Sequence, residues 1–131
     1  MATKQVIVIR RDLKMRRGKE IAQGAHGAMA FLTRRLVGDI ILCNQVGEKV
    51  MVSPVEEVWL RSSFRKVCVC VNSEQELLDI ETKAKAAGLE CHLVTDNGTT
   101  EFGGVPTKTC LAIGPDEDAK IDPVTGHLKL Y

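Results

Sequence analysis

The chain has 131 residues, of which 44% are hydrophobic and 27% are charged, and its formal net charge is +1. This length suits one domain and is too short for two ordinary ones, and the composition excludes a disordered or fibrous chain. Only 4% of the residues are aromatic, which argues against a single-strand binder that stacks bases on rows of rings. No apolar run reaches the roughly 18 residues that cross a bilayer, and residues 1–11 lack the order of a secretory signal. We therefore expect a cytoplasmic protein that has no membrane partner.

The cysteines do not have the spacing of a metal site. They are Cys43, Cys68, Cys70, Cys91 and Cys110. No CxxC pair occurs, and the three histidines are scattered along the chain, so we expect neither a metal nor another cofactor. Cys68 and Cys70 alternate with valines, which indicates small apolar residues that pack on one face of a strand. Free thiols are typical of a reducing compartment.

Basic residues crowd near the start of the chain. They are Arg10, Arg11, Lys14, Arg16, Arg17 and Lys19. A chain close to neutrality can still bind phosphate groups through one basic end. Charge patterning alone supports an ordinary solvated surface equally well.

The first half of the chain predicts a strand, a long helix and an irregular segment. Residues 5–10 are a β-branched run typical of a buried strand, and residues 19–37 have apolar side chains at helical spacing. Gly24 and Gly27 within that helix indicate that it lies very close to the sheet, or that something large approaches it. Residues 38–53 are an atypical insert, in which residues 39–43 and 49–52 suggest two strands with a turn at residues 47–48.

The second half alternates helices and strands. A proline-started helix is expected at residues 54–62, and a second helix begins at residue 74 and ends at Gly88. Strands are expected at residues 66–71, 90–95 and 109–113, the last of which is the final clear element. The chain therefore predicts one α/β domain over residues 1–131, with a small mixed, mostly parallel sheet and helices on both faces.

Three groups of motifs, taken together and in order, are specific. The first is Arg11-Asp12-Leu13-Lys14-Met15, Gly18-Lys19, Ala22-Gln23 and Ala25-His26; the second is Asp96-Asn97-Gly98 and Thr100-Glu101; the third is Thr109, Leu111-Ala112-Ile113-Gly114-Pro115 and Val124-Thr125-Gly126-His127-Leu128-Lys129-Leu130-Tyr131. In this order they resemble the type II peptidyl-tRNA hydrolase family, over residues 6–131 apart from about 37–65. The chain departs from the family pattern at Gly24, Gly27 and Thr99, and in the insert at 38–53.

The resemblance implies a carboxylic ester hydrolase that cuts the bond between a peptidyl group and its tRNA, which recycles the tRNA. It also implies a small sheet flanked by helices, tRNA as the partner and a homodimer. The catalytic residues that it implies are Lys19, Gln23, Asp96, Thr100 and Thr109. We predict that these five residues converge on one surface.

The residues themselves leave alternatives open. Lys19 is expected as an exposed lysine at a helix start, where nearby arginines disfavour its charged form and a carboxylate would favour it. Gln23, one turn further on, can hold water or the substrate carbonyl, or can be a surface amide. Asp96 follows a strand and can orient water or pair with Lys19, although its Asp-Asn-Gly run is also a turn signal. Threonine hydroxyls both donate and accept, which suits the holding of a water molecule.

The tRNA contacts are expected from basic residues and one histidine. They are Lys14, Arg16, Arg17, His26, Arg34 and Arg35. His26 also lies where a general base can act, although a lone helical histidine more often has a packing role, which we favour for it. A non-catalytic RNA-binding or adaptor module fits the charge pattern equally well, whereas an esterase for small substrates lacks a GxSxG motif. The joint presence of the five catalytic candidates favours hydrolysis.

Overall fold

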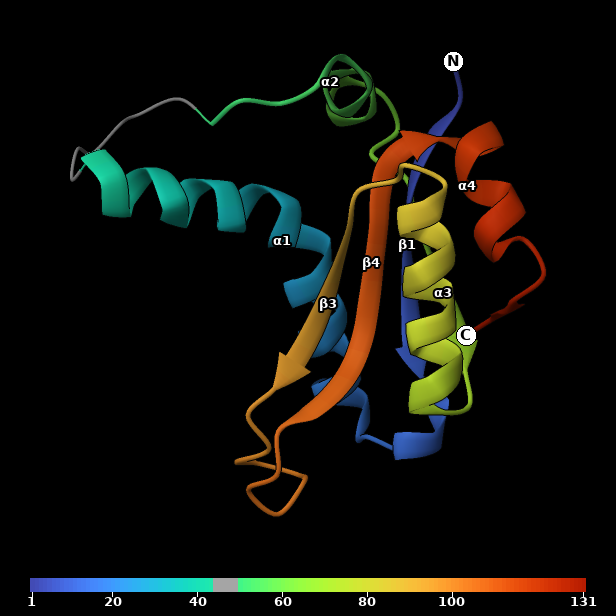
Figure 1. Ribbon diagram of the computed structural model, residues 1–131. Coiled ribbons are helices and arrows are strands. Elements are labelled where there is room, and N and C mark those ends of the chain that lie inside the picture. Colours follow the sequence, from blue (N-terminus) through green and yellow to red (C-terminus); the bar gives the residue numbers. More distant parts are fainter. Residues whose placement is uncertain (44–49) are drawn as a thin grey trace.

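The computed structural model describes residues 1–43 and 50–131, with the side chains of residues 37–43 left out. In chain order the elements are β1 (Thr3–Arg10), the 3-10 turn η1 (Arg11–Leu13), α1 (Arg17–Cys43), α2 (Pro54–Arg61), β2 (Lys66–Val71), α3 (Glu74–Ala86), β3 (Cys91–Asp96), β4 (Thr107–Glu117), α4 (Asp118–Thr125) and β5 (Lys129–Leu130). The five strands form one sheet in the order β3-β4-β1-β2-β5. Figure 1 shows α1 and α3 on opposite sides of this sheet.

The sheet is mixed, and the expectation that it is mostly parallel was wrong. Only β1 and β2 run parallel, whereas β4 pairs antiparallel with both β1 and β3, and β5 pairs antiparallel with β2. A parallel pair needs a long crossover, which α1 and α2 supply between β1 and β2. The connection between β3 and β4 contains no helix, so these neighbours form an antiparallel pair.

Both faces of the sheet are covered by helices, as predicted. Side chains alternate along β1, so that Val6 and Val8 join an apolar cluster with Leu77 and Ile80 of α3. Ile7 and Ile9 point to the other face, where they pack in a second cluster beside α1. Among the described residues no helix combines the length and the low charge that a bilayer crossing requires.

The long first helix differs from its predicted range. It begins at Arg17 and continues to Cys43, so the strand expected at residues 39–43 was wrong. A short apolar run fits a helix and a strand equally well, and here the helix continues through it. Residues 50–52 form no strand, and residue 49 and the turn expected at 47–48 lie outside the described residues.

Two glycines of α1 have different surroundings. A Cβ atom at Gly27 would lie 3.5 Å from atoms of Cys110 and Ala112, which confirms the predicted close approach to the sheet at this position. A Cβ atom at Gly24 would meet nothing within 4 Å. The packing role expected for Cys68 was wrong, since Cys68 is exposed while Cys70 is buried. Gly24 and Cys68 line the same groove, because α1 leaves this part of β2 uncovered.

The helix at residues 54–61 begins as its sequence predicts. Ser53 caps it, and the Ser53 side chain accepts from the Glu56 backbone N–H while the Glu56 carboxylate accepts from the Ser53 backbone N–H. Glu56 is buried and also accepts two hydrogen bonds from Arg35 of α1, at 2.8 and 2.9 Å. Arg35 therefore joins α1 to the start of α2.

Candidate active site

At the start of α1 the structure brings Lys19 into contact with two residues that lie 77 and 81 positions later in the chain. Lys19 lies in the first turn of α1, and Asp96 is the last residue of β3. The Lys19 ammonium donates to Asp96 Oδ1 at 2.9 Å and to Thr100 Oγ1 at 2.8 Å. The Lys19 side chain is 14% exposed, so the expected exposed lysine was wrong: the carboxylate holds it against the protein.

Two buried side chains extend this network inward. Gln23 Nε2 donates to Asp96 Oδ1 at 3.2 Å, and the Thr109 hydroxyl donates to Gln23 Oε1. Because Thr109 occupies the amide oxygen, the Gln23 amide is oriented with its nitrogen toward Asp96. All five predicted catalytic residues therefore belong to one hydrogen-bonded set that connects α1, β3, β4 and the loop at residues 97–106.

Asp96 is the centre of this set and is held as a carboxylate. The hydrogen bond from Lys19 lowers the pKa of Asp96 most strongly; burial opposes this effect, and the backbone N–H of Gly98 adds to it. Asp96 Oδ2 accepts from Gly98 N at 2.9 Å. A carboxylate with these donors is a weak base, so it is better suited to positioning Lys19 than to taking a proton.

The exposed end of the network has capacity to bind another molecule. An ammonium group has three N–H donors, and the described residues occupy two of those on Lys19. The Thr100 hydroxyl accepts from Lys19, so its own proton is available to a further acceptor. Two donors that lie next to each other in this way can stabilise an oxyanion or hold a water molecule.

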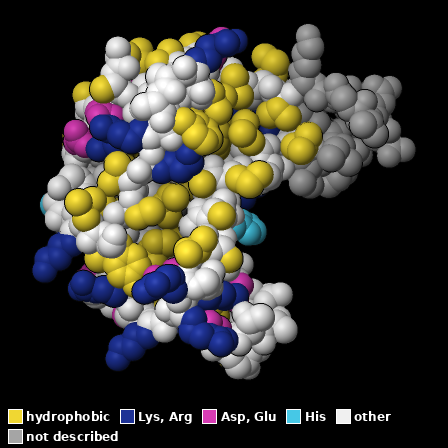
Figure 2. All heavy atoms as spheres, turned by 180° about the vertical axis from the view of Figure 1, so that it is seen from behind, with side chains coloured by type: hydrophobic (Ala, Val, Ile, Leu, Met, Phe, Trp, Pro, Cys, Tyr) yellow, Lys and Arg dark blue, Asp and Glu magenta, His cyan; other side chains and the backbone are white. Residues whose placement is uncertain are grey.

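The predicted tRNA-binding residues lie in two different settings. Lys14, Arg16 and Arg17 are exposed around the start of α1. Figure 2 shows Lys and Arg side chains gathered along the lower edge of the back face, below a broad apolar area. His26 is also exposed, so the packing role favoured for it was wrong: Gln23 and Gly27, rather than His26, face the sheet.

The side chains of Arg34 and Arg35 both make contacts within the protein. Arg34 contacts His92 Nδ1 and donates to the Leu93 carbonyl oxygen, both at 2.8 Å. Arg35 donates to Glu56 and also to Glu90 Oε2, the latter at 2.6 Å. These guanidinium groups join α1 to neighbouring elements.

One further residue at the site belongs to the motifs but had no predicted role. Glu101 follows Thr100 in the loop, and its carboxylate accepts from Arg16 Nε at 2.9 Å. The crowding of cations at a helix start was the available signal, because such a cluster is stabilised by carboxylates from elsewhere in the fold. The sequence does not show which acidic residue reaches it.

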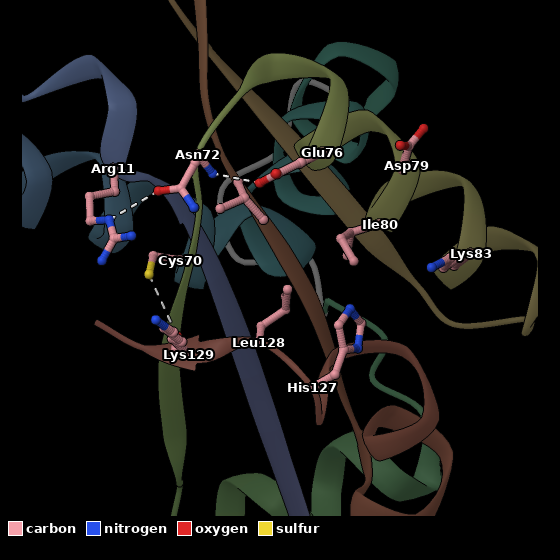
Figure 3. A pocket seen from close by; sticks show the side chains of 11 residues that line it. Arg11, Cys70, Asn72, Glu76, Asp79, Ile80, Lys83, His127, Leu128 and Lys129 are labelled. Carbon is pink, nitrogen blue, oxygen red and sulfur yellow. Dashed lines mark hydrogen bonds between the residues drawn. The ribbon is translucent and has the colours of Figure 1, made fainter.

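A separate pocket lies on the other side of the sheet, between α3 and the end of the chain. Its volume is about 360 Å³, and none of the five catalytic candidates lines it. Figure 3 shows Arg11 donating to Asn72 at one end, with Lys83 and His127 at the other. Groups of three or more potential metal ligands were found neither here nor elsewhere in the described part of the chain.

Comparisons with known proteins agree with the motifs. The sequence profile of the family described as Peptidyl-tRNA hydrolase PTH2 matches residues 3–131. A protein of Methanocaldococcus jannaschii named peptidyl-tRNA hydrolase is 44% identical over 128 residues, covering 97% of this chain and 98% of its own length. The protein of that name from Methanopyrus kandleri is also 44% identical, covering 97% of each chain. A probable peptidyl-tRNA hydrolase 2 of Drosophila melanogaster is 39% identical over 97% of this chain and 61% of its own length. The profile match and these relatives show that the chain belongs to the type II peptidyl-tRNA hydrolase family.

Proposed function

We propose that this chain hydrolyses the ester bond between the peptidyl group and tRNA, and that Lys19, Asp96 and Thr100 form its catalytic centre. The observation that carries the proposal is the pair of contacts from the Lys19 ammonium to Asp96 and Thr100, which lie 77 and 81 residues away in the chain. A mostly buried cation held between a carboxylate and a hydroxyl, with one N–H to spare, suits the stabilisation of a developing negative charge.

In this mechanism water adds to the ester carbonyl carbon and the carbonyl oxygen becomes an oxyanion. The free N–H of Lys19 and the Thr100 hydroxyl donate to that oxygen or orient the attacking water. The tetrahedral species then collapses and the bond from carbon to the ribose oxygen breaks. Of the two protons of the attacking water, one goes to the ribose oxygen and the other to solvent, so the peptide is released with a carboxylate and the tRNA with a free hydroxyl. Asp96 keeps the ammonium in place, and Gln23 and Thr109 keep Asp96 in place.

The tRNA is proposed to lie along the exposed cations at the start of α1. Lys14 and Arg17 can neutralise phosphates next to the centre, and Arg16 can add to them because its side chain is 81% exposed although its Nε contacts Glu101. The guanidinium groups of Arg34 and Arg35 instead join α1 to neighbouring elements. Backbone contacts of this kind position an RNA without reading its sequence. We place this activity in the cytoplasm, where peptidyl-tRNA arises.

A non-catalytic RNA-binding module is the less favoured function. Such a module would need the exposed cations but not the buried part of the network. Gln23 is 7% exposed and Thr109 is fully buried, and both orient groups that lead to Asp96. Burying polar side chains costs free energy unless they are paired, and a binding surface alone would not need this arrangement.

The test is release of labelled N-acyl-amino acid from tRNA under single-turnover conditions. Lys19→Met removes the ammonium and keeps much of the apolar stem, and we expect it to abolish hydrolysis. Lys85→Met is the matched control, since Lys85 is an exposed lysine of α3 that pairs with Glu81 within its own helix. Full activity of Lys19→Met would refute the site, and equal losses in both variants would point to a general effect on folding.

We also propose that the chain forms a homodimer through the apolar area between α1 and β2. A groove of about 630 Å³ lies there, and on its α1 side Ile21 is 65% exposed and Met29 is 57% exposed. Contiguous apolar surface of this kind commonly marks an interface, and a two-fold dimer uses the same patch on both copies. Ile21→Glu with Met29→Glu should give a monomer in sedimentation equilibrium. Met51→Glu, at a 79% exposed site outside the groove, is the control. A monomeric parent protein would refute the proposal.

A further inference from the structure

Three consecutive residues of the loop at residues 97–106 contact the rest of the protein near the start of α1. Thr100 accepts from Lys19, and Glu101 accepts from the backbone N–H of Arg16 at 3.4 Å as well as from its Nε. Phe102 packs on the apolar cluster that contains Ile7 and Ile9 of β1. Besides the contact that Thr100 makes itself, the loop therefore has two anchors, at Glu101 and Phe102, and both directly follow Thr100 in the chain.

The two partners of the Glu101 ion pair differ in exposure. The Glu101 side chain is only 14% exposed, whereas that of Arg16 is 81% exposed. An ordinary exposed pair contributes little, because two long side chains must be ordered in water. Here the carboxylate has already left most of its water, so its two donors from Arg16 replace lost hydration. The Glu101 side chain is therefore held inside the protein, and the Arg16 side chain covers it from the solvent side.

Thr100 depends on this anchor more than its neighbours in the network do. Lys19 and Gln23 lie on a helix, and Asp96 and Thr109 lie on strands. Thr100 alone among the five candidates lies in a connection without regular structure. Its hydroxyl stays 2.8 Å from Lys19 only while the loop is held in place.

We propose that Glu101 is a positioning residue for the hydrolysis: its carboxylate fixes the loop to α1 through Arg16 and so holds the Thr100 hydroxyl against the Lys19 ammonium. This inference rests on the proposed catalytic centre. A displacement of about 1 Å at a reacting group can cost up to about 100-fold in rate, and a loosened loop displaces Thr100 only part of the time. We expect a loss of about 10-fold in kcat when the ion pair is removed.

Glu101→Gln is the first variant, because it keeps the size of the side chain and an oxygen acceptor but removes the charge. Its kcat should fall, while its KM for peptidyl-tRNA should stay the same or decrease, since the change frees Arg16 and removes a negative charge beside the RNA. Glu57→Gln is the matched control: it breaks an exposed ion pair with Arg61 in α2 and should leave kcat unchanged. A stable Glu101→Gln variant with the parent kcat would overturn the inference.

Arg16→Ala removes the other partner of the same contact. Because the Arg16 side chain is exposed, we expect this change to have little effect on stability. We expect kcat at saturating substrate to fall as it does in Glu101→Gln, and the double variant to be no slower than the slower single variant. Additive losses would show that the two residues act separately, which would also overturn the inference.

Thr100→Ala separates the inference from the proposed centre. If Glu101 acts through Thr100, then Glu101→Gln should cause no further loss in a Thr100→Ala background, measured by single turnover at high enzyme concentration. A further loss of about 10-fold in that background would refute the positioning role, because a role in the fold alone would act in both backgrounds. Parent activity in Thr100→Ala would instead refute the catalytic centre itself.

Discussion

Asp96→Asn is the substitution for which the structure predicts the largest combined loss of stability and of activity. The two carboxylate oxygens face different donors: Oδ1 accepts from Lys19 and Gln23, and Oδ2 accepts from Gly98 N. An asparagine has one oxygen and one NH₂ group. In either orientation its NH₂ group therefore meets a donor, and in both orientations the Lys19 ammonium loses its counter-charge.

The size of the effect follows from burial. Lys19 and Asp96 side chains are 14% and 12% exposed, so the pair is closer to a buried ion pair than to a surface one. Removing one partner of a buried pair costs about 3–5 kcal/mol, and removing one hydrogen bond to a charged group costs about 1.5–3 kcal/mol. Because the end of the Lys19 side chain can turn toward water, we expect a loss of about 3 kcal/mol in the free energy of unfolding.

The pH dependence gives a second readout. The folded pKa of Asp96 is below the value of roughly 3.9 for an unfolded aspartate. The ion pair therefore contributes stability above that pH and loses it as pH falls toward the folded pKa. Urea unfolding of the parent and of Asp96→Asn, at pH 7 and at pH 3, should give a difference that shrinks at the lower pH. Equal stability of the two proteins at pH 7, or hydrolysis at the parent rate, would refute the reasoning.

Three other predictions concern different parts of the molecule. Lys14→Ala with Arg17→Ala should flatten the dependence of log affinity for tRNA on log salt by roughly one unit per lost contact, and an unchanged slope would place the RNA elsewhere. Burial opposes ionisation of Glu56, but hydrogen bonds from Arg35 and a backbone N–H outweigh it and lower its pKa to about 2. The charged Glu56 carboxylate thus stabilises the fold above roughly pH 4.3, and this contribution is lost as the pH falls toward 2. In Glu56→Gln the free energy of unfolding should therefore depend less on pH within that window. Gly98→Ala should lower kcat, because Gly98 has φ +81° and a Cβ atom would lie 2.1 Å from the Val105 carbonyl oxygen; parent activity there would show that the turn is not needed.

The strands and capped helices were predictable because their signals are local. The β-branched run at residues 66–71 and the Ser53-Pro54 start of α2 both have the predicted structure. The strand expected at residues 39–43 failed because a short apolar run has no periodicity of its own, and α1 continues through it. The last helix, Asp118–Thr125, contains Pro123 in a polar stretch and gave no apolar period to detect.

The site was predictable in its members but not in its connections. Each of the five candidates belongs to one of the sequence motifs. The contacts that run from Thr109 through Gln23 to Asp96, however, depend on which side chains face the space between α1 and the sheet. Glu101 was missed for the same reason, since its contact with Arg16 spans 85 residues. The engagement of Arg35 by Glu56 and Glu90 likewise follows from tertiary packing that charge patterning does not report.

The contacts of Arg35 have a consequence for engineering of the chain. Arg35 donates to the Met51 carbonyl oxygen and to Glu56, so one guanidinium fixes both the chain that leaves along α1 and the chain that returns to α2. The return point is then set by these bonds rather than by the length of the sequence between them. A change at Arg35 would therefore loosen both segments at once, so an engineered variant of this part of the chain should keep Arg35 and Glu56.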